Sequence, residues 1–170
     1  MAMPDMSEGP KDDIARAIVA QGDSEAILAI LTELCRITDM GFAAVARVTD
    51  TRWIACQVLD KIEFGLDPGD ELELSTTICN EIRQSRRAVI IDEVADHPEW
   101  SRHPVPTLYG FQSYVSLPIM LDDGSFFGTL CAIDPRPRQI SAPALVAQIE
   151  ELARRVAAIL SGEAGAAARR

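Results

Sequence analysis

Cys79 is the residue with the clearest chemical potential in this chain of 170 residues. It lies near the start of a helix that we predict over residues 76–85, with Ser75 as the N-cap. Unpaired backbone N–H groups and the helix dipole at such a position stabilise a thiolate and lower the pKa of a cysteine. Cys79 could therefore be reactive. Free cysteines are also among the most buried residue types, so plain core packing is the competing interpretation.

A second group of side chains suited to binding lies in residues 92–110, which we expect to form a long irregular loop of functional importance. An indole, an imidazole and a phenol beside a guanidinium can stack on a planar or anionic ligand and hydrogen-bond to it. The alternative is that Trp100 and Tyr109 anchor the loop while the histidines, each followed by proline, occupy turns. The candidate residues are Asp92, Trp100, Arg102, His103 and Tyr109.

The remaining motifs argue against an enzyme. No G-x-S-x-G elbow occurs and no Cys/His pair can be identified, so a serine or cysteine hydrolase is poorly supported. The two histidines, His97 and His103, have no cysteine at ligand spacing, which disfavours a zinc site. We therefore predict neither catalytic residues nor a metal. The cysteines form no C-x-x-C pair, as is typical of reduced structural cysteines in an intracellular protein; they are Cys35, Cys56, Cys79 and Cys131.

Composition and charge indicate that the protein binds neither nucleic acid nor membranes. The formal net charge of −10 opposes binding to phosphate backbones, and the arginines are scattered apart from Arg83, Arg86 and Arg87, so we expect no nucleic-acid partner. No apolar run approaches the ~20 residues that span a bilayer, and the leader over residues 1–11 lacks the features of a secretory signal. We expect a cytoplasmic protein with no membrane contact.

Hydrophobic periodicity predicts an α+β order of elements in a single domain. We expect a disordered tail at 1–11, the folded domain at 12–160, and a flexible tail or linker remnant at 161–170, where Gly162 and Gly165 break the last helix. In chain order we predict a short helix from about Asp12, a helix from about Ser24 to Gly41, strands at 42–48 and 53–59, an acidic connection at 61–74, the helix at 76–85, a strand at 88–91, a β-hairpin at 113–134 and a helix from Ser141.

The hairpin at 113–134 is the strongest local signal. Two apolar runs flank Asp123-Gly124, a dipeptide that favours a two-residue turn with positive φ angles. Strand alternation puts Phe127, Cys131 and Ile133 on one face, and Phe126 and Leu130 on the other. Neither face is polar, so we expect both faces of the sheet to be covered.

The same stretch resembles the central hairpin of GAF domains, the sensor modules of bacterial signalling proteins such as histidine kinases. A strand with Tyr114 ends in Pro118-Ile119, and the next strand runs Gly-Thr-Leu-Cys-x-Ile-Asp at 128–134. The resemblance covers about residues 23–160, and Ser116 departs from it, because many relatives have glycine there and backbone approach to a ligand is altered. Further matches lie at Ser75 to Cys79, Asp96 to Trp100 and Pro135 to Arg138.

The resemblance implies a GAF-like, PAS-related fold: a central antiparallel sheet of about five to six strands, with the first and last helices on one face and a ligand pocket on the other. It implies a small-molecule sensor in signal transduction, such as a two-component system, that is part of or partner to a histidine kinase or similar output module. The helix bearing Cys79 would wall the pocket and residues 92–110 would close it. The expected ligand-binding residues are Cys79, Asp92, Trp100, Arg102, His103, Tyr109, Tyr114 and Ser116.

The last helix is a candidate dimer interface. Its apolar residues repeat with 4-3-4-3 spacing over about two heptads, fewer than a coiled coil normally needs. The alternative is that all apolar residues of this helix form one wide surface that packs on the core of the domain. Because the first and last helices of GAF domains commonly form a dimer bundle, the resemblance favours a homodimer. The expected interface residues are Leu145, Ile149, Leu152, Val156 and Ile159.

The effector and any cofactor stay unknown at this point. No Cys-His dipeptide exists for bilin attachment, and the Asn-Lys-x-Phe-Asp-Glu signature of cyclic-nucleotide-binding members is missing. Two alternatives stay open beside the sensor. One is a GAF-fold thiol oxidoreductase of the free methionine sulfoxide reductase type, and the other is a ligand-free dimerisation module whose cavity is filled by its own side chains.

Overall fold

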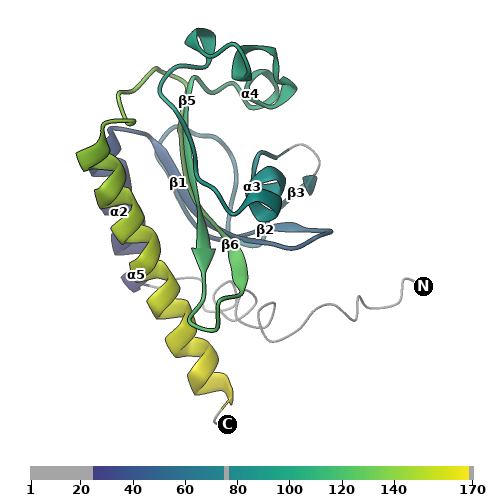
Figure 1. Ribbon diagram of the computed structural model, residues 1–170, viewed down its shortest axis with the longest axis vertical. Helices are drawn as coiled ribbons and strands as arrows, with labels where there is room; N and C mark the ends of the chain where they lie inside the picture. The colour runs from purple at the N-terminus through teal and green to yellow at the C-terminus, as the bar shows by residue number, and fades with distance from the viewer. Residues whose placement is uncertain (1–24, 75–76, 169–170) are drawn as a thin grey trace.

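The computed structural model describes residues 25–74 and 77–168. Its centre is a six-stranded sheet in the order β3-β2-β1-β6-β5-β4, in which every neighbouring pair is antiparallel (Figure 1). The predicted α+β class is confirmed. The strands are β1 (Phe42–Val48), β2 (Trp53–Asp60), β3 (Glu71–Leu72), β4 (Val89–Ile91), β5 (Ser113–Met120) and β6 (Phe126–Asp134), and the helices are α2 (Glu25–Thr38), α3 (Cys79–Ser85), α4 (Pro104–Tyr109) and α5 (Pro143–Ala168).

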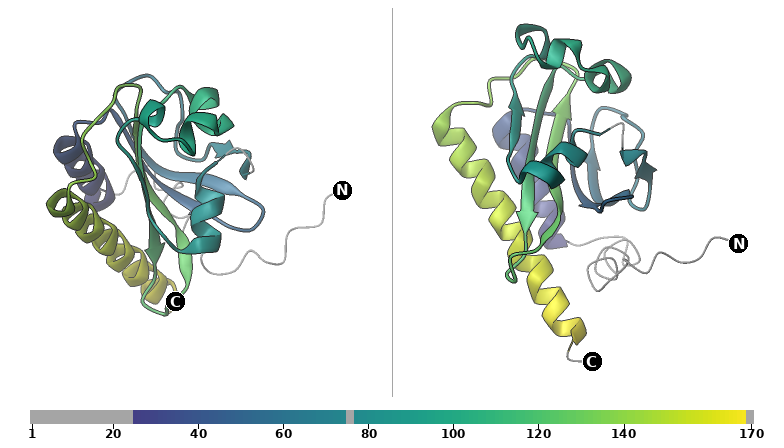
Figure 2. Two further views of the ribbon diagram at one scale, coloured as in Figure 1. Left: turned by 45° about the horizontal axis from the view of Figure 1, so that its top comes forward. Right: turned by 45° about the vertical axis from the view of Figure 1, so that its right-hand side comes forward.

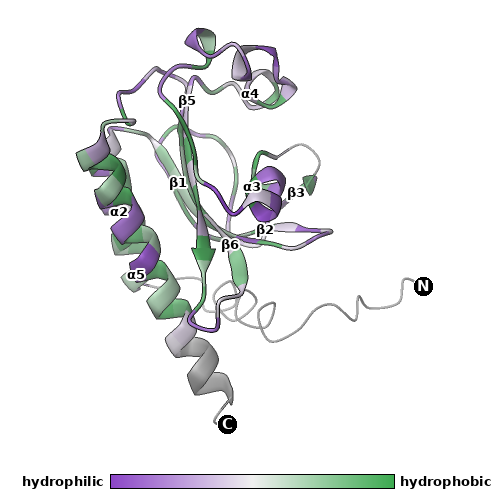
Figure 3. Ribbon diagram, in the orientation of Figure 1, coloured by the Kyte–Doolittle hydropathy of each residue, from purple (hydrophilic) through white to green (hydrophobic). Residues whose placement is uncertain are grey.

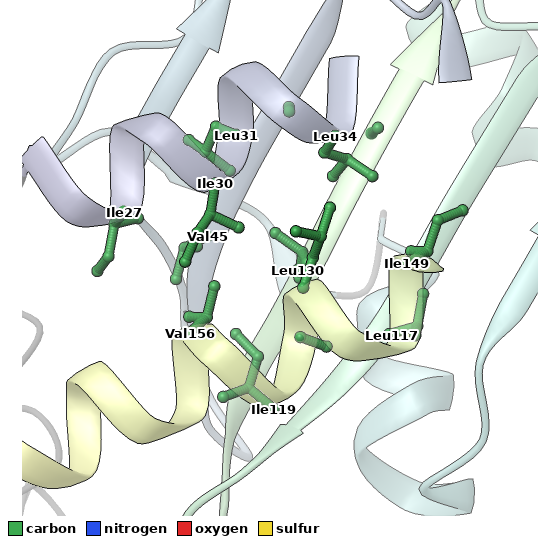
Figure 4. Packing of buried hydrophobic residues seen from close by; sticks show 14 of the residues in the cluster. Ile27, Ile30, Leu31, Leu34, Val45, Leu117, Ile119, Leu130, Ile149 and Val156 are labelled. Atoms are coloured by element: carbon green, nitrogen blue, oxygen red, sulfur yellow. The ribbon is translucent and has the colours of Figure 1, made fainter. Parts of the chain in front are cut away.

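Helices α2 and α5 lie side by side on one face of the sheet (Figures 1 and 2). In α2 the buried residues Ile27, Ile30, Leu31 and Leu34 follow the predicted helical spacing. They form one core cluster with strand residues such as Val45 and with buried side chains of α5 (Figure 4). The first and last described helices therefore cover the same face, as expected from the resemblance.

The 4-3-4-3 stripe of α5 belongs to this core rather than to a surface that could meet a partner. The exposed fractions of Ile149, Leu152 and Val156 are 0%, 4% and 0%. Leu145 and Ile159 are partly buried and pack against the same cluster. The expectation that these five residues form the dimer interface is therefore wrong for the three that the core covers, because α2 and the sheet already occupy their contact surface.

The ends of two predicted helices differ from the sequence-based expectation. Helix α5 continues to Ala168 through Gly162 and Gly165, where we predicted a break. Helix α3 begins at Cys79, and its N-cap residue Ile78 provides no side-chain hydrogen bond. The predicted cap Ser75, the tail at 1–11 and the short helix near Asp12 lie outside the described residues.

The predicted hairpin of β5 and β6 is confirmed, with two local differences. Its loop has three residues, Asp122 to Gly124, closed by hydrogen bonds from Gly124 N to Leu121 O and from Leu121 N to Ser125 O. Only Gly124 has a positive φ, because this longer loop needs a left-handed residue at one position.

The second difference is a register shift. Ile119 pairs with Gly128 but Met120 pairs with Phe126. The irregularity skips Phe127 and turns its side chain toward the helix layer, whereas Phe126 joins the opposite cluster with Cys131 and Ile133. The predicted faces of Phe126 and Phe127 were therefore exchanged.

Gly128 permits the close approach of β6 to β1. A Cβ atom built on it would lie 1.8 Å from the carbonyl oxygen of Ala46. Any larger residue at this position would therefore push the two central strands apart. The close packing of β6 against β1 therefore requires a glycine at this position of the Gly-Thr-Leu-Cys motif.

The opposite face of the sheet is covered by α3, α4 and the connection from β2 to β3 (Figure 2). Residues 92–110, predicted as an irregular loop, contain two 3₁₀ turns, η2 (Val94–Asp96) and η3 (Trp100–Arg102), and then α4. Figure 3 shows mostly hydrophobic residues along the central strands and mostly hydrophilic residues along α3. Both faces of the sheet are buried, as predicted. Among the residues described, no helix has the length and apolar character needed to cross a membrane.

Candidate functional site

An apolar cavity of about 50 Å³ lies between the sheet and the layer formed by α3, α4 and the β2 to β3 connection. Such a volume has room for a few water molecules and is far below the roughly 300 Å³ of a usual small-ligand site. Aromatic and aliphatic side chains make up most of its wall. The lining residues are Phe42, Trp53, Phe64, Leu66, Leu72, Thr77, Ile78, Cys79, Val105, Tyr109, Phe111, Tyr114, Cys131 and Ile133.

Cys79 meets the sheet on one side of this cavity. Its Sγ lies 3.2 Å from Thr129 Oγ1, 3.7 Å from the Tyr114 hydroxyl and 4.0 Å from Ser116 Oγ. Alternation along β5 and β6 brings these groups to one face, since residues two apart point the same way. All of them are buried, so Cys79 has polar neighbours inside an otherwise apolar wall.

The phenol of Tyr114 and the thiol of Cys131 keep their protons at neutral pH. Burial raises the pKa of the Tyr114 phenol well above its ordinary value, and the nearby Cys79 adds to that rise. Burial likewise raises the pKa of the Cys131 thiol. Both groups can therefore donate hydrogen bonds but do not supply a nucleophilic anion.

An aromatic pair lies between the cavity and an outer groove of about 460 Å³, and the two spaces share part of their lining. Phe64 and Tyr109 line both spaces, and their ring centroids are 6.0 Å apart. Phe64 also contacts Phe42 on β1, with centroids 4.9 Å apart. The two rings therefore form a wall that a larger ligand would have to displace.

The carboxylate of Asp60 fixes the chain on the Phe64 side of this wall. It accepts hydrogen bonds from the backbone N–H groups of Ile62, Phe64 and Gly65 at 2.9–3.1 Å. Burial alone would raise the pKa of Asp60, but these backbone donors outweigh it and lower the pKa. The charged carboxylate therefore holds the backbone of the segment that carries Phe64.

Of the predicted ligand-binding residues, Cys79, Tyr109 and Tyr114 line the cavity. Ser116 is not in the lining, but its hydroxyl lies 4.0 Å from the Cys79 sulfur. Trp100 is buried but outside the lining, with its indole 5.2 Å from the His103 ring.

His103 serves the local fold. Its Nδ1 accepts a hydrogen bond from Val105 N, which caps α4, and its Nε2 lies 3.5 Å from Glu81 Oε1 on α3. Arg102 is exposed. The expectation that Trp100, Arg102 and His103 reach the ligand does not match this arrangement, because η3 and the start of α4 direct them outside the lining.

Asp92 lies away from the cavity and connects two elements. Its Oδ1 accepts a hydrogen bond from Ile140 N at 2.9 Å, and its Oδ2 accepts one from Ser141 Oγ at 2.5 Å. The backbone carbonyl of Asp92 also accepts a hydrogen bond from Arg138 N. Asp92 thus joins the end of β4 to the segment that leads into α5. Its role here is structural, and it does not line the cavity, where we expected it to bind a ligand.

Sequence reasoning missed much of the wall. Trp53 begins β2, Phe64 lies in the connection that we predicted only as acidic, and Phe111 follows α4. An aromatic residue beside a glycine, as in Phe64-Gly65, was the available signal. Among the described residues, no cluster of three or more histidine, cysteine or acidic side chains could hold a metal ion.

Solved structures with the same fold include sensors and an enzyme. The cyanobacteriochrome receptor PixJ has 14% identity and a TM-score of 0.63, covering 87% of this chain and 97% of its own. The GAF domain of a two-component sensor histidine kinase from Bacillus halodurans has 13% identity and a TM-score of 0.62, covering 83% and 95%. The type II free methionine-R-sulfoxide reductase from Thermoplasma acidophilum has 13% identity and a TM-score of 0.60, covering 87% and 94%.

These identities establish similarity of fold only. A comparison with curated proteins finds no match. The family model described as GAF domain matches residues 24–160, most of the chain. The chain is therefore a member of the GAF domain family.

Proposed function

We propose that this GAF domain is a sensor that binds a small molecule in the cavity beside Cys79 and Tyr114. The observation that carries the proposal is the apolar cavity, which has buried hydroxyl and thiol groups at one side. Apolar walls with a few convergent polar groups are typical of small-ligand sites. Binding would enlarge the cavity by displacing the wall at Phe64 and Tyr109.

The central strands offer a route from the cavity to the helices. On β1, Phe42 lines the cavity while Ala43 and Val45 pack in the helix layer. On β6, Cys131 lines the cavity while Leu130 packs against the helices. Because adjacent residues of a strand point to opposite faces, displacement of either strand by a ligand would reach α2 and α5.

Helix α5 supports a signalling role for this movement. It extends beyond the end of the sheet in Figure 1 and so reaches away from the cavity. We infer a homodimer formed through the outward surfaces of α2 and α5, with a histidine kinase or similar bacterial output module as the receiver. A cytoplasmic location is part of this proposal.

Two other functions have specific support. The fold of the methionine-R-sulfoxide reductase and the positions of Cys79 and Cys131 on one cavity favour a thiol oxidoreductase. The raised pKa of Cys131 argues against it, because the thiolate is the reactive form. The small cavity volume of about 50 Å³ favours a ligand-free dimerisation module. Turnover of free methionine sulfoxide with a thiol reductant would establish the enzyme.

The deciding experiment combines native mass spectrometry of freshly purified protein with thermal-shift measurements against a panel of metabolites. Val105 lines the cavity from α4, whereas Thr107 on the same helix is exposed. We expect Val105→Phe to fill the cavity and abolish the stabilisation by any ligand found. Thr107→Phe, which adds the same ring on the solvent side, should retain it. A ligand that stabilises both variants equally would place the binding site elsewhere.

A further inference from the structure

Trp53 carries an unsatisfied hydrogen-bond donor in the cavity wall. The side chain lines the cavity and only 3% of its surface is exposed. Its indole N–H is buried and has no hydrogen-bond partner among the residues that the structure describes. A buried N–H group without a partner is destabilising, since it loses its hydrogen bonds to water. An acceptor atom on a bound molecule would remove that cost.

The charges around the site limit what such a molecule can be. Neither the cavity nor the outer groove has a lysine, arginine or histidine in its described lining. The groove does contain the carboxylate of Glu63. A negatively charged ligand would lose its hydration without gaining a cationic partner, so anions are disfavoured.

The space available limits its shape. The inner cavity holds about 50 Å³, and the groove beyond Phe64 and Tyr109 holds about 460 Å³. Each of these two rings is followed by a glycine with positive φ, Gly65 at 92° and Gly110 at 75°. The planes of the two rings are tilted by 44°, and their separation would widen the connection between the two spaces. A passage lined by two aromatic side chains suits a flat ring system.

We propose that the ligand of this site is a flat, largely apolar molecule without negative charge, and that a hydrogen-bond acceptor on it binds the indole N–H of Trp53. The molecule enters between Phe64 and Tyr109 and reaches Trp53 in the inner cavity. This inference rests on the proposed sensor function and adds the chemical class of the ligand.

Nuclear magnetic resonance tests the hydrogen bond directly, because the chain has two tryptophans and hence two indole N–H signals. Trp100→Phe assigns the signal of Trp53. The probes are quinoline, which has a ring nitrogen as acceptor, naphthalene, which has the same shape and no acceptor, and 2-naphthoate, which adds a carboxylate. We expect quinoline to move the Trp53 indole proton downfield and to bind at least ~5-fold more tightly than naphthalene. We expect 2-naphthoate to bind most weakly.

A Trp53→Phe variant should still bind naphthalene but lose the preference for quinoline. If that variant does not fold, the indole signal of the unsubstituted chain decides alone. Equal binding of quinoline and naphthalene, with no shift of the Trp53 proton, would overturn the inference while leaving the sensor function standing. Tight binding of 2-naphthoate would overturn the charge argument. If none of the probes perturbs signals of cavity residues, the inferred ligand class is wrong, and the metabolite panel decides the sensor function separately.

Discussion

Buried ionisable side chains in this domain divide into two kinds according to their hydrogen-bond partners. The Asp134 carboxyl is buried, which alone would raise its pKa, but hydrogen bonds from Arg136 and from Gly41 N outweigh burial and lower the pKa. For the buried thiol of Cys35, the pKa moves in the opposite direction. Burial raises the pKa of Cys35 to about 11, with Lys61 opposing and Asp134 assisting the rise. At neutral pH the Asp134 carboxylate therefore stays charged and the Cys35 thiol stays neutral.

The raised pKa of Cys35 predicts a loss of stability in alkali. An unfolded cysteine ionises near pH ~8.5, whereas folded Cys35 keeps its proton up to about pH 11. The unfolding free energy is therefore unaffected by this group below pH ~8.5 and falls as the pH rises from there toward 11. We expect Cys35→Ala to reduce the slope of unfolding free energy against pH by about 1.4 kcal/mol per pH unit in that window. Urea denaturation of both proteins between pH 8 and pH 11 measures this.

Some slope should persist in Cys35→Ala. The pKa values of Tyr114 and Cys131 are also raised by burial and act with the same sign. An identical slope in both proteins would show that Cys35 does not keep its proton in the folded state.

At the scale of elements, the link between β4 and the start of α5 depends on Asp92. Asp92→Ala removes the acceptors for Ile140 N and Ser141 Oγ, and we expect a loss of about 1–3 kcal/mol in unfolding free energy. Hydrogen exchange at the Ile140 amide should become faster. Asp96→Ala is the matched control, because Asp96 is exposed on the same segment and should change neither quantity. Unchanged exchange at Ile140 in Asp92→Ala would contradict this link.

Elements with strong local periodicity could be predicted from the sequence. Helix α2 and the β5 to β6 hairpin appear near their expected positions, because their apolar spacing and turn residues are local signals. The short helix α4 and the turns in residues 92–110 could not be predicted, because a histidine cap and packing against Trp100 stabilise them. Their sequence has no helical period.

The candidate site could be predicted only in part, for a related reason. Cys79 and Tyr114 were found because the family resemblance covers the strands and the helix that carry them. Trp53 and Phe64 were missed because the β2 to β3 pairing and the Asp60 carboxylate determine where they lie. Such contacts join residues through tertiary geometry, which no single-sequence pattern reports.

For the whole molecule, the burial of α5 changes where a dimer contact has to lie. The residues opposite the buried stripe are small or charged and exposed, and include Ala147, Glu151, Arg154 and Ala158. Glu151 and Arg154 already form an ion pair within the helix at 2.7 Å. Small residues permit close approach of a second helix, so the outward surface is the one that could meet a partner.

We therefore predict that the chain forms a concentration-dependent homodimer and that Ala147→Arg with Ala158→Arg converts it to a monomer, because four arginines would meet across a twofold axis. Sedimentation velocity over a range of concentrations measures the association, and circular dichroism verifies that the fold is retained. Ile149→Glu with Val156→Glu should instead unfold the domain, because both side chains are completely buried. If the unsubstituted chain sediments as a monomer at every concentration, the helices do not mediate association. If the arginine variant stays dimeric, the contact lies on another surface of the domain.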